Sequence, residues 1–286
     1  MSPRHYPALD IIWSVDPEQI EIDRAMASLD DFAPTAVEDL STGLRVYFTS
    51  IDDRDRALGA MRLALPDVAL SALTVSDEAW AERSQAALGP VRIGRFIVSP
   101  PWSPQVDDFD ATIDLPITIL PSMGFGTGHH ASTRLCLRHL QTLPLASKAV
   151  LDVGTGSGVL AIAASRLGAA RVLAIDLDED ALTSARENIE LNHATNQIDV
   201  RTLDLTTDAS TLPAAFDVIT ANLTGAMLMR YVEVLAGWMN RPAHLIVSGF
   251  QTHEAADVSR ALESAGLIVA RREDEDTWVA LLFSKP

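Results

Sequence analysis

The chain has little cysteine and no long apolar run. A single cysteine, Cys136, among 286 residues excludes an internal disulfide and a cysteine metal cluster. No apolar stretch approaches the roughly 18 residues that cross a bilayer, and the first residues, MSPRHYPALD, lack the apolar core of a signal peptide. We therefore expect a cytoplasmic protein with no membrane partner.

Basic residues are also scarce. The sequence has 22 lysines and arginines against 39 acidic residues, which leaves a net charge of −17. Such a surface repels phosphate, which argues against direct nucleic-acid binding, and attracts a basic protein partner. Composition leaves open the alternative that the charge only keeps the protein soluble. We expect a monomer.

Three glycines dominate the centre of the sequence. Gly154, Gly156 and Gly158 follow one apolar run and precede an apolar helical pattern, and a second apolar run ends at Asp176. Strand, loop, helix and strand in about 30 residues form one βαβ unit. Glycines let backbone approach a ligand closely, and Asp176, about 20 residues after the first glycine, can accept hydrogen bonds from ribose hydroxyls.

The spacing of these glycines narrows the ligand. It is G-x-G-x-G, not the G-x-G-x-x-G of a dinucleotide site, and Asp152 stands two residues before it. A carboxylate there repels pyrophosphate and attracts the cationic amino-acid tail of S-adenosyl-L-methionine. The pattern therefore favours an adenosylmethionine site over another nucleotide or a structural turn, and it opposes a nicotinamide oxidoreductase.

The order of expected elements predicts two domains joined by a linker. Residues 1–76 follow a β-α-β-β-α-β order, typical of a ferredoxin-like α+β domain, with the first helix expected at residues 17–29. A polar helix and the proline-rich SPPWSP segment place a linker at residues 77–105. Over residues 106–286 helices alternate with strands, which predicts an α/β fold with a mainly parallel sheet.

The last two expected strands, 267–271 and 277–283, indicate the type of α/β sheet. They are joined only by residues 272–276, so they must be antiparallel, because a parallel crossover needs a dozen residues or more. Seven strands with a terminal antiparallel hairpin are typical of a class I, Rossmann-like methyltransferase domain. The acidic link, RREDED, is expected to be a solvated hairpin.

Four segments in this order carry a family resemblance: GFGTGHHASTRLCL, LDVGTGSGVLAIAASRLGA, IDLDEDALTSARENIELN and ANLTG. Over residues 77–286 the chain resembles the ribosomal protein L-eleven methyltransferase family, PrmA, and the N-terminal domain matches that family's recognition domain in layout. The resemblance implies an adenosylmethionine-dependent protein N-methyltransferase that acts on lysine side chains and the terminal amino group of a ribosomal protein. Lysine methyltransferases of the electron-transfer flavoprotein beta subunit are similar in the catalytic half, but tend to lack a full ferredoxin-like module; they are the alternative.

The resemblance also implies the site residues. It assigns the cofactor to Thr133, Gly154, Asp176 and Asn222, with Phe125 and Thr127 as neighbours, and the glycine turn adds Gly156. Asp204, just past the third strand of the expected domain, can bind the adenine amino group or cap its loop.

Asn222 is the candidate catalytic residue. It ends a strand at the sheet edge where open α/β folds bind ligands, and its carboxamide oxygen can accept hydrogens from an amine substrate. Two alternatives are a helix N-cap and a domain that binds adenosylmethionine without catalysis.

Histidine and cysteine are the other residue types in residues 106–286 that could bind a metal or act as a nucleophile. The adjacent residues His129 and His130 point apart and have no partner at metal-ligand spacing, so no metal is expected. Either they donate hydrogen bonds from the loop, or they are simply polar side chains on the surface. Cys136 lies among leucines and is expected in the core.

Overall fold

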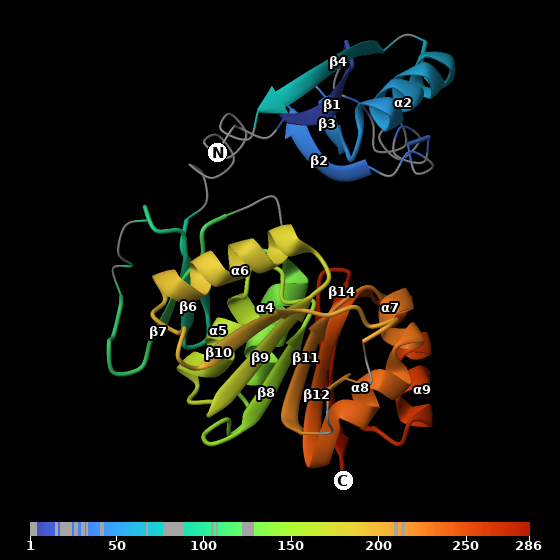
Figure 1. Ribbon diagram of the computed structural model, residues 1–286. Helices are drawn as coiled ribbons and strands as arrows, with labels where there is room; N and C mark the ends of the chain where they lie inside the picture. The colour runs from blue at the N-terminus through green and yellow to red at the C-terminus, as the bar shows by residue number, and fades with distance from the viewer. Residues whose placement is uncertain are drawn as a thin grey trace. The chain divides into compact units, whose positions relative to one another are not determined.

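The computed structural model describes the chain except residues 1–4, 15–16, 18–24, 26–27, 30–31, 33, 41–42, 67, 77–88, 104–105, 107, 122–128, 209–210 and 213–214 (Figure 1). Two compact units divide the chain, Met1–Ala87 and Leu88–Pro286. No helix in the described part is both apolar enough and long enough to span a bilayer.

The first unit is a four-stranded antiparallel sheet with one described helix. Its elements are β1 (His5–Ile12), β2 (Pro34–Leu40), β3 (Gly43–Phe48), α2 (Ile51–Ala64) and β4 (Ala69–Ser76). The strand order is β2-β3-β1-β4, and every neighbouring pair is antiparallel. This is the order of the predicted ferredoxin-like unit. The helix expected at residues 17–29 lies largely outside the described residues.

A small sheet opens the second unit. It contains β5 (Val91–Ile93), β6 (Phe96–Ser99) and β7 (Leu115–Thr118) in that order, with β6 and β7 parallel. Phe96 and Ile117 are buried in the same core as the helices that follow. Residues 91–99, which the sequence places in the linker, therefore belong to the second unit, because their apolar side chains are buried there. The expected connector helix at 77–88 lies outside the described residues.

The main sheet has seven strands. The elements that build it and its helical layers are α4 (Ala131–Leu140), β8 (Ala149–Val153), α5 (Val159–Arg166), β9 (Arg171–Asp176), α6 (Glu179–Leu191), β10 (Ile198–Thr202), β11 (Phe216–Asn222), α7 (Gly225–Arg230), α8 (Val232–Trp238), β12 (Met239–Gln251), α9 (Ala255–Ser264), β13 (Ile268–Glu275) and β14 (Trp278–Lys285). The order is β10-β9-β8-β11-β12-β14-β13, and only β14 runs opposite to the other six strands. This order confirms the class I methyltransferase fold.

Each face of this sheet is covered by its own helices. Val150 packs with side chains of α4, α5 and α6, whereas its neighbour Leu151 packs with those of α7, α8 and α9. Successive residues of a strand point to opposite faces, so one apolar strand contributes to both cores. The switch in strand order falls between β8 and β11, where open α/β sheets bind ligands at the carboxyl edge (Figure 1).

The C-terminal hairpin differs from the expected solvated link. β13 continues to Glu275, and the turn is limited to Asp276, with φ 54°, and Thr277. Glu275 accepts a hydrogen bond from Arg134 Nε of α4 at 2.6 Å and also pairs with Arg138. Glu273 also pairs with Arg138, whereas Asp274 is exposed and pairs with Arg272 of the same strand. The pairing of the two glutamates with α4 joins distant segments, which local composition does not reveal.

Candidate functional site

The glycine turn leaves the carboxyl end of β8. Its first two backbone N–H groups, of Gly154 and Thr155, both donate to the carbonyl of Ile175 on β9, at 2.9 and 3.0 Å. Gly154 has φ 68°, and a Cβ at this position would lie 2.5 Å from Leu223 Cδ2. Only glycine meets both conditions without a shift, so backbone forms the floor of the site here.

Asp176, the last residue of β9, faces this turn. One carboxylate oxygen accepts from Gly156 N at 3.0 Å and the other from Asp178 N at 3.1 Å. A carboxylate has about four lone-pair positions, so two backbone bonds fix its orientation and leave acceptor capacity. Asp176 lines the cleft, where that capacity can meet ribose hydroxyls.

The carboxylate of Asp152 lies beneath the turn and is 1% exposed. Its two oxygens accept from Thr155 Oγ1 at 2.7 Å and from Thr220 Oγ1 at 2.6 Å. Burial raises the pKa of Asp152 to about 6, although both hydroxyls oppose this shift. From the sequence, the Asp152 carboxylate is expected to face the cationic amino-acid tail of adenosylmethionine. The structure instead makes Asp152 a buried support of the turn, so any attraction acts through the turn.

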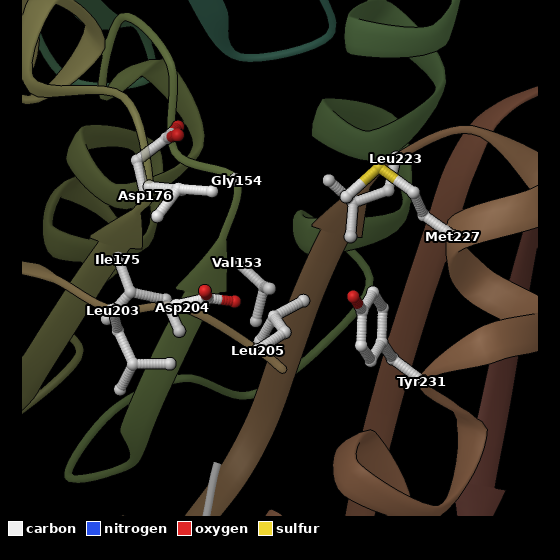
Figure 2. Close-up of a pocket in the computed structure, with 11 residues that line it drawn as sticks. Val153, Gly154, Ile175, Asp176, Leu203, Asp204, Leu205, Leu223, Met227 and Tyr231 are labelled. Atoms are coloured by element: carbon white, nitrogen blue, oxygen red, sulfur yellow. The ribbon is translucent and has the colours of Figure 1, made fainter. Parts of the chain in front are cut away.

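A cleft of about 460 Å³ opens at this edge of the sheet. Its lining residues are Val153, Gly154, Ile175, Asp176, Leu177, Leu203, Asp204, Leu205, Leu223, Met227 and Tyr231. Figure 2 shows Asp176, Ile175 and Leu203 on one side, and Leu223, Met227 and Tyr231 on the other. The walls are mainly apolar, as a stacked adenine requires.

Asp204 lies in the loop after β10 and lines the cleft. Its Oδ1 accepts from Thr206 Oγ1 at 2.6 Å and from Thr206 N at 2.7 Å, and these bonds lower the pKa of Asp204. Asp204 thus caps its loop through Oδ1 and also lines the cleft. The two predicted roles are compatible.

Asn222, the last residue of β11, meets Thr133 of α4. Its Nδ2 donates to Thr133 Oγ1 at 3.4 Å, while its Oδ1 is buried and has no hydrogen-bond partner among the described residues. The cap alternative is wrong, because Thr224 is the N-cap of α7 and accepts from Met227 N. A buried acceptor of this kind calls for a ligand or another partner.

Comparison with known proteins places this chain in a family. A sequence model described as "Ribosomal protein L11 methyltransferase (PrmA)" matches residues 12–286. The Ribosomal protein L11 methyltransferase of Geobacter sulfurreducens is 37% identical over 269 residues, which cover 90% of this chain and 86% of that protein. That of Pelotomaculum thermopropionicum is 40% identical over 227 residues, covering 79% and 71%. The chain belongs to this methyltransferase family.

A solved structure agrees with this assignment. The crystal structure of ribosomal protein L11 methylase from Lactobacillus delbrueckii subsp. bulgaricus aligns with a TM-score of 0.63 at 28% identity. The alignment covers 69% of this chain and 99% of that one. The protein is a protein methyltransferase that uses S-adenosylmethionine, and the site accommodates this cofactor. Gly154 gives close backbone approach, Asp176 has acceptor capacity toward the cleft, and the cleft walls are apolar.

The other residues singled out in the sequence that the structure describes are His129, His130 and Cys136, which lie at or near α4. His130 is the N-cap of α4, and its ring meets the Trp278 ring edge-on with centroids 4.4 Å apart. His129 Nε2 lies 3.2 Å from the carbonyl of Gly89. The described residues contain no cluster of three metal-ligating side chains. Cys136 is fully buried, as predicted, and burial raises the pKa of its thiol. Phe125 and Thr127 lie outside the described residues.

The sequence predicts three of the 11 residues that line the cleft, Gly154, Asp176 and Asp204. Met227 and Tyr231 are among those that it misses. They follow Leu223 at steps of four, so all three fall on one side of a helical path. That spacing, directly after the ANL segment, was the available signal. Tyr231 is also the residue between α7 and α8.

Proposed function

We propose that the enzyme methylates lysine side chains, the N-terminal amino group, or both, of ribosomal protein L11. It acts as a monomer in the cytoplasm. The names of the relatives support this substrate. The observation that carries the chemistry is the buried carboxamide oxygen of Asn222, at the carboxyl edge of the sheet. Ala221, the residue before it, pairs with Val153, which precedes the glycine turn. A net charge of −17 suits a basic protein substrate.

The proposed cofactor site uses residues from five segments. Gly154 and Gly156 supply backbone, Asp176 accepts from the ribose, and Asp204 borders the adenine. We assign Thr133 and Asn222 to the side nearest the reacting group. They contact each other between α4 and β11, and neither is among the residues that line the described cleft. Phe125 and Thr127 join this set on the family resemblance alone.

The proposed reaction needs a neutral, well-aimed amine. S-adenosylmethionine supplies a methyl group on a sulfonium, so the new N–C bond forms in line as the C–S bond breaks. A lysine amine with an ordinary pKa near 10.4 must first release a proton to solvent. Asn222 Oδ1 then accepts one remaining amine hydrogen and holds the nitrogen about 3 Å from the methyl carbon, with its lone pair directed at it.

The first unit supports the ribosomal substrate over the electron-transfer flavoprotein. Its β2-β3-β1-β4 sheet is a separate compact unit, and the described part of Met1–Ala87 contains no member of the cofactor cleft. We assign it to substrate recognition. A catalytic domain alone has no need of such a unit.

One labelling experiment tests the proposal. Ribosomal proteins from a strain lacking the enzyme are incubated with the protein and methyl-labelled S-adenosylmethionine, beside proteins from the parent strain. We expect label in L11 from the deficient strain and little in L11 from the parent, where the sites are already methylated. Label confined to a non-ribosomal protein would refute the substrate while leaving the reaction class intact.

A further inference from the structure

Two asparagines on α6 are buried and lie one helical turn apart. Asn188 is 0% exposed and Asn192, the C-cap residue of α6, is 2% exposed. A buried carboxamide is costly unless its donor and acceptor groups find partners. Both side chains find hydrogen-bond partners at the end of β7 or just after it, and Asn188 finds a second partner in the glycine turn.

Asn192 binds Thr118 through both of its polar groups. Thr118 N donates to Asn192 Oδ1 at 2.9 Å, and Asn192 Nδ2 donates to the carbonyl of Thr118 at 2.6 Å. The carboxamide thus pairs with β7 as the backbone of a neighbouring strand would. Asn192 Nδ2 also donates to the carbonyl of Asn188 at 2.7 Å, and Arg166 Nη2 donates to Asn192 Oδ1 at 3.5 Å. None of these contacts involves the glycine turn.

Asn188 joins two different segments. Its Oδ1 accepts from Leu120 N at 2.8 Å, and its Nδ2 donates to the carbonyl of Ser157 at 2.9 Å. Ser157 belongs to the glycine turn that contains Gly154 and Gly156. Leu120 is the second residue after β7, and from it the sequence continues into the other glycine-rich stretch. One side chain therefore sets the distance between the turn and the residue that precedes that stretch.

We propose that Asn188 is a positioning residue for cofactor binding, which acts by holding the glycine turn through the Ser157 carbonyl and tying it to Leu120. The inference rests on the proposed role of the turn in holding adenosylmethionine. Asn188 lines no part of the described cleft, so its effect on the cofactor is indirect. Its bond to the turn is made to a carbonyl, whereas the N–H groups of Gly154 and Thr155 donate to Ile175.

The chain offers a matched control in Asn192. Asn188→Ala and Asn192→Ala each remove one buried carboxamide from α6, and each leaves one backbone N–H and one carbonyl outside the helix without that partner. Asn192→Ala also removes the bond from Asn192 Nδ2 to the carbonyl of Asn188. Only Asn188→Ala releases the turn. Binding of S-adenosylhomocysteine by calorimetry is the readout, with the thermal midpoint of each variant measured beside it.

We expect both variants to lose stability to a similar extent, and Asn188→Ala alone to raise Kd, by about fivefold for one buried hydrogen bond. The proposal would be overturned if Asn188→Ala and the wild type had equal Kd values, or if Kd rose by the same factor in both variants. A wild type that does not bind S-adenosylhomocysteine would instead contradict the proposed function.

Two measurements cover the case in which Asn188→Ala does not fold. Asn188→Asp keeps the acceptor for Leu120 N but removes the donor to Ser157, so its Kd should rise as well. In the wild type, S-adenosylhomocysteine should slow hydrogen exchange at the Leu120 amide more than at the Thr118 amide. Unchanged Kd in Asn188→Asp, or equal exchange effects at the two amides, would count against the coupling.

Discussion

Asn222 Nδ2 donates to Thr133 Oγ1 at 3.4 Å, which joins the end of β11 to the first turn of α4. The two residues are 89 positions apart in sequence. Because the amide nitrogen is directed at the threonine, the carboxamide oxygen is the group left to accept from a substrate. This orientation makes Asn222 the centre of the proposed chemistry.

Substitution of Asn222 should therefore affect the chemical step. Asn222→Ala is expected to lower kcat by about 100-fold, because the amine loses the acceptor that aims it, and to change the Kd of S-adenosylhomocysteine much less. Single-turnover methyl transfer and calorimetry give the two values. Asn240→Ala is the control, since Asn240 binds Asp217 at the start of β12. Full transfer by Asn222→Ala would place the chemistry elsewhere.

Asp176 should govern cofactor affinity. Asp176→Ala removes a carboxylate that orients the turn through Gly156 and can bind the ribose, so we expect Kd to rise about 100-fold for two charge-assisted bonds. Asp178→Ala is the matched control two residues on. It removes the N-cap of α6, which accepts from Asp180 N at 2.9 Å, and should cost about 1 kcal/mol of stability without weakening binding. Similar Kd values for the two variants would contradict the assignment.

A side chain at Gly154 should disturb the floor of the cleft. Gly154→Ala puts a Cβ 2.5 Å from Leu223 Cδ2, so Leu223 must move and binding should weaken. Gly266→Ala is the control, because Gly266 has a similarly positive φ of 80° but no atom within 4 Å of the added Cβ. Both variants should lose about 1–2 kcal/mol through backbone strain, and only Gly154→Ala should lose affinity, as calorimetry can show. Equal affinity in both would count against close backbone approach at this position.

The buried carboxyl of Asp152 predicts a pH dependence of stability. Its pKa rises from 3.8 to about 6 on folding, so the folded protein binds this proton more tightly than the unfolded chain. The stabilisation from Asp152 is therefore complete below about pH 4 and is lost as pH rises through about 6. The free energy of unfolding of the wild type, relative to that of Asp152→Asn, should fall by about 2 kcal/mol between pH 4 and pH 7.

Urea unfolding of both proteins at several pH values measures this difference. Comparison with Asp152→Asn cancels the other titrating groups, including His130 and His139, whose pKa values are lowered chiefly by burial and which act in the opposite direction over this range. A difference that is constant with pH would show that Asp152 titrates normally in the folded protein.

Much of the fold followed from local patterns, and the exceptions have physical causes. Strands and helices alternate in the second unit, and the short link before β14 allows only an antiparallel pair, so the seven-stranded sheet was predictable. Parallel strands end at one edge, which brought Asp176 and Asn222 to the same region. The structure places both residues there, and their roles remain predictions.

Contacts between distant segments were not predictable from one sequence. The extent of β13 depends on Arg134 and Arg138 of α4, which pair with its acidic residues. The position of Asp152 under the turn depends on the hydroxyl of Thr220, one strand away. The contacts of Asn188 with Leu120 and Ser157 are of the same kind, since an asparagine in a helical segment gives no local sign that it binds two other segments.

Removal of the first unit should separate recognition from cofactor binding. A chain without residues 1–87 retains the whole described cleft, so its Kd for S-adenosylhomocysteine should match that of the full chain. Transfer to the protein substrate should be lost, because the proposed recognition surface is gone. Transfer at the full-length rate would refute the recognition role.

The proposed enzyme transfers methyl groups to amines of ribosomal protein L11, and Asn222 orients the amine that reacts. The most direct test of this proposal incubates purified, unmethylated L11 with methyl-labelled S-adenosylmethionine and either the wild type or Asn222→Ala, and identifies the labelled amino acids by mass spectrometry of peptides. We expect methyl groups on lysine side chains, the terminal amino group, or both, with the wild type, and almost none with the variant. An unlabelled L11 with a wild type that binds the cofactor, or equal labelling by both proteins, would contradict the account.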